Sequence, residues 1–157
     1  MASVGYLRDT CLIRTMNGLV FEYNIYKRHI GFDFVVNSIV PDIIARLKST
    51  HYIPEDGVFE GFDSIFLFAF EDQLFEIDSD GSVIEIEDYL AIGSGKNEAI
   101  GSLLSSDGLD PKERIIKAIK ASTVHDIYVD YPIIMTNSED TDFEIVTKKW
   151  KWLFKIN

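Results

Sequence analysis

The sequence predicts an α+β protein in which antiparallel sheets are flanked by helices. Along the chain, the hydrophobic patterns run in the order helix, helix, strands, helix, helix, strands. The strand-like runs in the middle of the chain are separated by short turns of the hairpin type. With 157 residues, of which 46% are hydrophobic, the chain fits a single domain with its own core.

Two helices are predicted in the first third of the chain. The first begins near Asp9 or Thr10, either of which could cap it, and runs to about Tyr23. The second covers about 32–48, where apolar residues recur at helical spacing. Pro41 lies inside this second pattern and should kink the helix or start a new piece, because proline lacks the backbone N–H.

The stretch that begins "SIFLFAFEDQLFEIDSDGSVIEIE" predicts three strands, separated by Glu71-Asp72 and by Asp80-Gly81. The same residues come close to a calcium-loop spacing, with acids at Glu76, Asp78 and Asp80 and a final Glu87. The flanking runs alternate like strands, and Asp-Gly is a strong hairpin signal, so we expect a hairpin and no metal site.

Two further helices should follow, over 96–105 and from Pro111 onward, with Asp110 as the cap of the second. The apolar residues predicted to form the buried face of the second helix are Ile115, Ile116, Ala118 and Ile119. The stretches "IYVDYPIIMT" and "FEIVTKKWKWLF" are expected to be closing strands, joined by the polar turn "NSEDTD".

Three consecutive motifs carry a family resemblance. They are "DYLAIGSGKNEAIGSLL", "DGLDPKERIIKAIKAS" and "HDIYVD", within residues 59–129. In this order they resemble the peptidase subunits of the proteasome superfamily, in particular the bacterial ATP-dependent peptidase subunit and its short relatives in bacteria and phages. The resemblance implies a truncated αββα fold of the N-terminal nucleophile hydrolase type, with a core over about 4–137 and a C-terminal strand or tail over 143–157.

The same resemblance implies roles for two residues, Ser94 and Asp126, as supports of a catalytic site. The family's nucleophile is an N-terminal Thr, Ser or Cys, followed by a supporting lysine, and "MASVGY" supplies neither. We therefore expect these supports to be vestigial. Gly93, Ser94 and Gly95 form a glycine turn whose N–H groups would favour an anion. The alternative is that the glycines only serve the turn and Ser94 only caps a helix.

Other reactive residues suggest ordinary structural roles. Cys11, the only cysteine, lies near the start of a predicted helix and is expected to be a small buried side chain. His29, His51 and His125 share no ligand spacing. No cofactor and no metal are predicted, and the single cysteine suits a cytoplasmic protein.

Charge is distributed unevenly along the chain. The formal net charge is −11, which disfavours nucleic-acid binding, and no apolar run is long enough to cross a membrane. The C-terminal "TKKWKWLFKIN" contains four lysines and no acid. Its aromatic residues Trp150, Trp152 and Phe154 are candidates for an edge strand or for docking on a neighbouring subunit.

Three functions are compatible with these features. The first is a non-catalytic, proteasome-subunit-like protein that acts as a homo-oligomer or by binding a protein partner. The second is a threonine-type peptidase subunit whose nucleophile segment is missing from this sequence or is supplied by another chain. The third is an acidic inhibitor of a nucleic-acid-handling protein.

Overall fold

A computed structural model describes residues 1–15, 31–49, 61, 63–70, 72–137 and 142–148. Its contacts divide the chain into two compact units, Met1–Gly93 and Ser94–Asn157, which are described one at a time. Both units combine helices with antiparallel strands, so the predicted α+β class is confirmed. A single domain over 1–157 stays a prediction.

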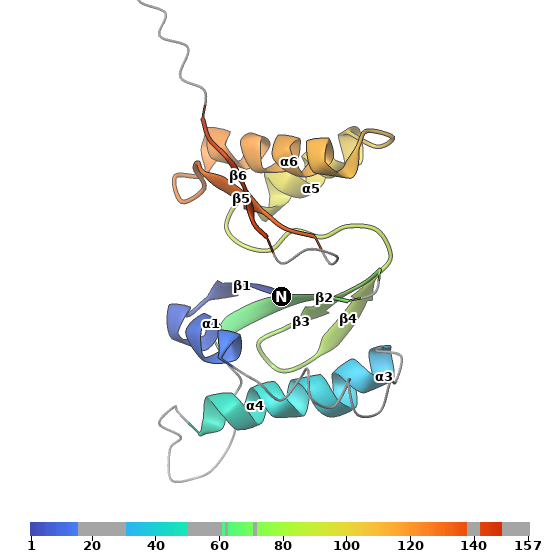
Figure 1. Ribbon diagram of the computed structural model, residues 1–157, viewed down its shortest axis with the longest axis vertical. Coiled ribbons are helices and arrows are strands. Elements are labelled where there is room, and N and C mark those ends of the chain that lie inside the picture. Colours follow the sequence, from blue (N-terminus) through green and yellow to red (C-terminus); the bar gives the residue numbers. More distant parts are fainter. Residues whose placement is uncertain (16–30, 50–60, 62, 71, 138–141, 149–157) are drawn as a thin grey trace, which may run out of the picture. The chain divides into compact units, whose positions relative to one another are not determined.

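The first unit contains a four-stranded antiparallel sheet in the order β1-β2-β3-β4 (Figure 1). Its strands are β1 (Ala2–Gly5), β2 (Ser64–Phe70), β3 (Gln73–Ile77) and β4 (Val83–Ile86). The last three strands are those predicted from the alternating runs, because their turns allow antiparallel neighbours to pair directly.

The helix α1 (Leu7–Arg14) begins earlier than the sequence predicted, and Asp9 does not cap it. Asp9 instead lies within the first turn, where it is buried. Thr15 stands at the C-cap of α1, and the rest of the predicted helix, from residue 16 to Tyr23, lies outside the described residues.

The second predicted helix is confirmed as three continuous pieces, α3 (Phe32–Phe34), η1 (Val35–Ile39) and α4 (Val40–Lys48). The middle piece is a π-turn in which the Val40 N–H donates to the Val35 carbonyl. Pro41, which has no N–H, lies in the first turn of α4. The expected irregularity at the proline therefore takes the form of a wider turn just before it.

The core of the first unit lies between these helices and one face of the sheet (Figure 1). In the β2–β3 register Phe66 pairs with Ile77, and Phe68 with Phe75, which places large side chains on the same face. The Phe68 and Phe75 rings stack with centroids 6.3 Å apart. The buried members of this core are Ile13, Val35, Ile39, Val40, Ile43, Leu47, Phe66, Phe75 and Ile77.

The β3–β4 connection is a hairpin, as predicted, and not a helix-flanked calcium loop. The Asp78 N–H donates to the Ser82 carbonyl over 2.9 Å, and Gly81 has a φ of +85°, which favours glycine. The Ser82 hydroxyl and backbone N–H lower the pKa of Asp80 from its ordinary value of 3.8. The small stability from these bonds is therefore present above that value and lost as the pH falls through the lower, folded-state pKa.

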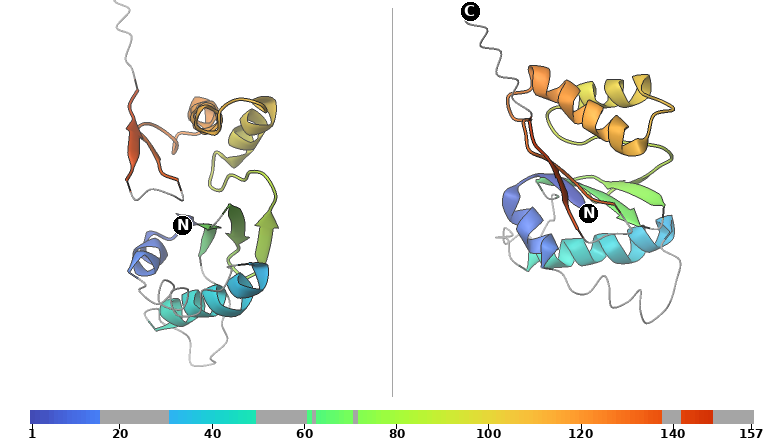
Figure 2. Two further views of the ribbon diagram at one scale, coloured as in Figure 1. Left: turned by 45° about the vertical axis from the view of Figure 1, so that its right-hand side comes forward. Right: turned by 45° about the horizontal axis from the view of Figure 1, so that its top comes forward.

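The second unit consists of two helices and a two-stranded ribbon. The helices α5 (Lys96–Ser105) and α6 (Pro111–His125) lie side by side in both views of Figure 2. Both were predicted, and the Asp110 carboxylate caps α6 by accepting the N–H groups of Lys112 and Glu113.

The buried face of α6 differs in part from the prediction. Ala118 is buried as expected, and Ser122 joins it, whereas Ile115 is 43% exposed. Ile116 and Ile119 are partly buried, whereas Ile115 lines an open pocket together with Met135 and Phe143.

The ribbon strands are shorter than predicted, β5 being Ile133–Met135 and β6 Glu144–Val146. In their register Ile134 pairs with Ile145. The predicted start of the strand "IYVDYPIIMT" is wrong: His125 ends α6, residues 127–128 form a turn, and β5 begins only at Ile133.

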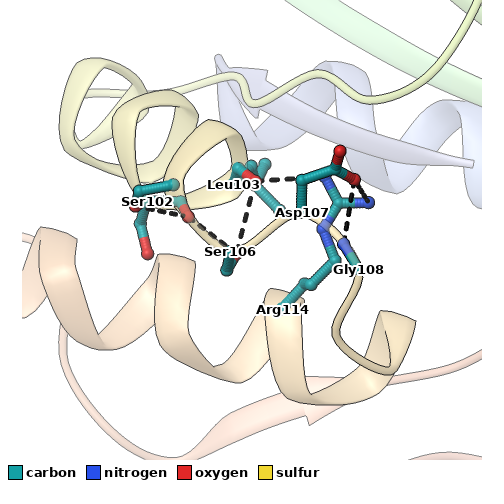
Figure 3. Close-up of polar contacts among 7 residues, drawn as sticks. Ser102, Leu103, Ser106, Asp107, Gly108 and Arg114 are labelled. Atoms are coloured by element: carbon teal, nitrogen blue, oxygen red, sulfur yellow. Dashed lines mark hydrogen bonds and ion pairs between the residues drawn. The ribbon is translucent and has the colours of Figure 1, made fainter.

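Hydrogen bonds fix the corner between α5 and α6 (Figure 3). The Arg114 guanidinium donates to the Leu103 carbonyl over 3.1 Å, and the Ser106 hydroxyl donates to the Ser102 carbonyl over 2.7 Å. The Gly108 N–H donates to Asp107 Oδ1, and Gly108 has a φ of +81°. The bonds from Arg114 and Ser106 satisfy carbonyls that the end of α5 would otherwise leave without partners.

Candidate functional site

The glycine turn at residues 93–95 joins the two units in sequence. Glycine is favoured at its two positions, Gly93 and Gly95, for different physical reasons. Gly93 is the last residue of the first unit and has a φ of +105°, a conformation that residues with a Cβ rarely adopt. Gly95 has an ordinary φ and stands at the N-cap of α5. A Cβ on Gly95 would lie 2.7 Å from the Cβ of Ser122, so this position is limited by space.

Ser122 is the partner that makes the second glycine necessary, and sequence reasoning missed it. Its hydroxyl donates to the Gly95 carbonyl over 2.7 Å, and the side chain is buried. It also reaches the Ala118 carbonyl at 3.2 Å, within its own helix. A small polar residue on the apolar side of α6 was the available signal, because such a residue permits close backbone approach.

Ser94 is exposed, and its role as a support of catalysis stays a proposal. Gly95, not Ser94, stands at the N-cap of α5, and no side chain caps that helix. Among the described residues, none forms a hydrogen bond with the Ser94 hydroxyl. The simple helix-cap interpretation of Ser94 is therefore wrong, and the hydroxyl faces solvent next to the first N–H groups of α5.

Asp126 stands at the C-cap of α6 and turns the chain toward the ribbon. Its Oδ1 accepts the Tyr128 N–H over 2.8 Å, and its N–H donates to the Ser122 carbonyl over 3.0 Å. Its Oδ2 is buried and has no hydrogen-bond partner within the described part of the chain. Because Gly95 packs against Ser122 and Val129, the glycine turn lies at the same end of α6 as Asp126.

The other candidate residues do not join this group. Cys11 lies in α1, as expected for a helix position, but it is exposed and not buried. His125 is exposed at the end of α6. The residues His29, His51, Trp150, Trp152 and Phe154 lie outside the described residues.

A buried polar pair in the first unit was also not predicted. The Ser64 hydroxyl donates to Asp9 Oδ2 over 2.8 Å and accepts the Tyr6 N–H at 3.1 Å. Both side chains are almost fully buried, and Ser64 lines an open pocket of about 670 Å³ together with Gly5 and Gly61. The pair ties the start of α1 to the start of β2, because a buried carboxylate requires such donors.

Over the described residues, no cluster of three or more His, Cys, Asp or Glu side chains could hold a metal ion. No helix in the same part of the chain is long and apolar enough to cross a membrane.

Comparison with solved structures identifies the fold. The chain is similar to Thiobacillus denitrificans BPH, with a TM-score of 0.60 and 19% identity, over 93% of this chain and 73% of that one. A second structure, Thiobacillus denitrificans BPH in complex with Epoxomicin, gives a TM-score of 0.60 at 18% identity, with the same coverage. This chain has the BPH fold. No family model matches the chain, and no curated protein matches it.

Proposed function

We propose that this chain is a proteasome-subunit-like protein that acts by self-assembly or by binding a protein partner, without catalysis of its own. The observation that carries the proposal is the set of large apolar side chains that the described residues of 94–148 expose. Contiguous exposed apolar surface marks sites that bind other proteins. Seven large apolar side chains here are at least 60% exposed: Leu104, Val124, Ile127, Tyr128, Ile134, Phe143 and Ile145.

The proteasome-like part of the proposal rests on the fold and on the motifs. The BPH fold covers almost the whole chain, and one BPH structure contains epoxomicin, a proteasome inhibitor. The motifs "AIGSGKNEA" and "LDPKERIIKAIKAS" form the turn and the helix pair of the second unit. These are the positions at which the sequence resembles the peptidase subunits.

The non-catalytic part rests on how the hydroxyl groups are used. A serine nucleophile needs a base within hydrogen-bond reach. The Ser122 and Ser106 hydroxyls donate to main-chain carbonyls, and that of Ser64 donates to the buried Asp9. These bonds hold elements together. Ser94, the residue nearest to the family's site by resemblance, is exposed.

The second candidate is a threonine-type peptidase subunit that obtains its nucleophile from outside this sequence. It is favoured by one observation, the epoxomicin complex of a protein with the same fold. Turnover of fluorogenic peptides and labelling by an epoxomicin-type probe test whether this chain is catalytic on its own, with BPH as the positive control for the probe. We expect no turnover and no labelling. Labelling at residue 1 or at Cys11 would overturn the non-catalytic proposal.

The role of the C-terminal segment in assembly has its own test. We expect the full chain to form a homo-oligomer, in which Trp150, Trp152 and Phe154 contribute to the interface. Light scattering on the full chain and on a chain that ends at Thr147 compares the two masses. A smaller mass for the shorter chain supports the proposal, and an unchanged oligomer removes only the segment's part in it.

A further inference from the structure

We propose that a pocket in the second unit is the docking site for the C-terminal segment, residues 149–157, of a second copy of this chain. The inference rests on the self-assembly proposed above and names the surface that would carry it. The pocket is open and has a volume of about 590 Å³, within the roughly 300–1,000 Å³ that is common for binding pockets.

Part of the pocket lining is apolar. The lining residues come from the first turns of α6 and from the end of the ribbon where β5 finishes and β6 begins. Pro111 and Ile115 line it from the helix, and Met135 and Phe143 line it from the ribbon. Ile115 is 43% exposed and Phe143 is 67% exposed, so apolar surface here is open to a partner.

The charged part of the pocket lining is mainly acidic. Its described residues include three acids, Asp110, Asp142 and Glu144, and one cation, Lys112, which gives a formal net charge of −2. Lys112 Nζ pairs with Glu144 at 2.6 Å. A helix N-terminus usually favours an anion, but here the Asp110 carboxylate already accepts the first N–H groups of α6. The pocket therefore suits an occupant that is apolar and positively charged.

The C-terminal segment "KWKWLFKIN" has this chemistry. It carries three lysines and no acid, and its aromatic residues are Trp150, Trp152 and Phe154. In an extended chain Trp150 and Trp152 would point to one side and Lys149 and Lys151 to the other. Tryptophan is a frequent anchor at interfaces, and opposite charges accelerate the encounter between partners.

A second copy is favoured over the chain's own segment by the direction of β6. The pocket lies at Glu144, where β6 begins, whereas Lys148 follows the other end of the strand. There Lys148 pairs with Asp130 at 3.6 Å and lies 5.7 Å from the Tyr131 ring centroid. To enter this pocket, the chain's own segment would have to reverse its direction and run back along the ribbon. A neighbour's segment needs no reversal.

Tryptophan fluorescence of the full chain tests the docking, because Trp150 and Trp152 are the only tryptophans in the protein. The emission therefore reports on the segment alone. We expect emission at shorter wavelength in the oligomer, and a shift to longer wavelength on dilution that follows the fall in mass measured by light scattering. High salt should weaken the association, because it screens the lysines of the segment from the acidic side chains that line the pocket.

The Ile115→Lys variant tests the pocket itself. It places a cation among the apolar residues that line the pocket. We expect it to weaken association by about tenfold or more and to shift the tryptophan emission to longer wavelength. The matched control is Leu7→Lys, which makes the same kind of change at a side chain that is 74% exposed and lies in the other unit. It should alter neither reading. Far-UV circular dichroism establishes that both variants fold.

The remaining outcomes separate this inference from the function on which it rests. If Ile115→Lys assembles like the natural chain with its tryptophans still shielded, the docking is overturned and self-assembly stands. If the full chain is monomeric at every concentration, self-assembly fails. An emission that responds to Ile115→Lys but not to dilution would place the segment on its own copy, which also overturns the inference.

Discussion

The two units of this protein bury apolar side chains in different ways. The first unit, Met1–Gly93, has a cluster of nine buried apolar residues between its helices and its sheet, including the fully buried rings of Phe66 and Phe75. In the second unit, Gly95 at the N-cap of α5 packs against Ser122 of α6, and the buried residues of the two helices are Ala99, Leu103, Ala118 and Ser122. Its seven most exposed large apolar side chains point outward instead.

The difference lies in where the large apolar side chains are placed. A core of large side chains stabilises the first unit through buried area. A small residue such as Gly95 lets the N-cap of α5 approach α6 closely, but it buries less apolar area than a large side chain does. The described part of the second unit leaves large apolar side chains exposed, and the proposed assembly would use them.

The largest effect should come from the core of the first unit. Phe75→Ala removes a fully buried ring, and we expect a loss of about 3–5 kcal/mol in the free energy of unfolding. Leu104→Ala, at a side chain that is 69% exposed in α5, should change it by less than about 0.5 kcal/mol. Urea unfolding followed by circular dichroism measures both. Equal losses would remove the contrast between the units.

A smaller effect should come from the helix contact of the second unit, where Gly95 at the N-cap of α5 is compared with Gly101 inside that helix. Gly95→Ala places a Cβ 2.7 Å from that of Ser122, and we expect a loss of about 1–3 kcal/mol from overpacking. Gly101→Ala places its Cβ more than 4 Å from any atom beyond the adjoining helix backbone, and it should gain about 0.5–1 kcal/mol. If both variants gain stability, close packing at Gly95 is not what requires glycine.

No measurable effect is expected for calcium at the β3–β4 hairpin. Strands and not helices flank this turn, and Asp80 Oδ1 accepts the Ser82 N–H within it. No group of three or more acids in the described residues could hold a metal ion. A calorimetric titration at micromolar concentrations should give no heat of binding. A binding curve that Asp80→Ala abolishes would restore the calcium-loop interpretation.

The elements with regular patterns and strong end signals could be predicted from the sequence. The helix 96–105, the Asp110 cap and the Asp80-Gly81 hairpin all depend on neighbouring residues, so local patterns suffice for them. The Asp9–Ser64 pair could not be predicted in this way, because its members are 55 positions apart and meet only through the fold. The apolar residues Ile127 and Tyr128 suggested a strand after His125. In the structure both are exposed and lie in a turn, so their apolar character does not reflect burial in a sheet.

The candidate site was predictable in its residues but not in its contacts. The glycine turn was evident as a turn, and Gly93 has the left-handed conformation that such a turn requires. The reason for Gly95 is its distance from Ser122, which no spacing within the sequence encodes. The catalytic-support roles of Ser94 and Asp126 stay proposals.

The central claim is that this chain associates with itself, and its molar mass in solution tests that claim most directly. Light scattering on the full chain over a dilution series that begins at tens of micromolar gives the mass without any label. The account predicts a multiple of 17.9 kDa at the high end, with dissociation on dilution. A mass of 17.9 kDa at every concentration would contradict it.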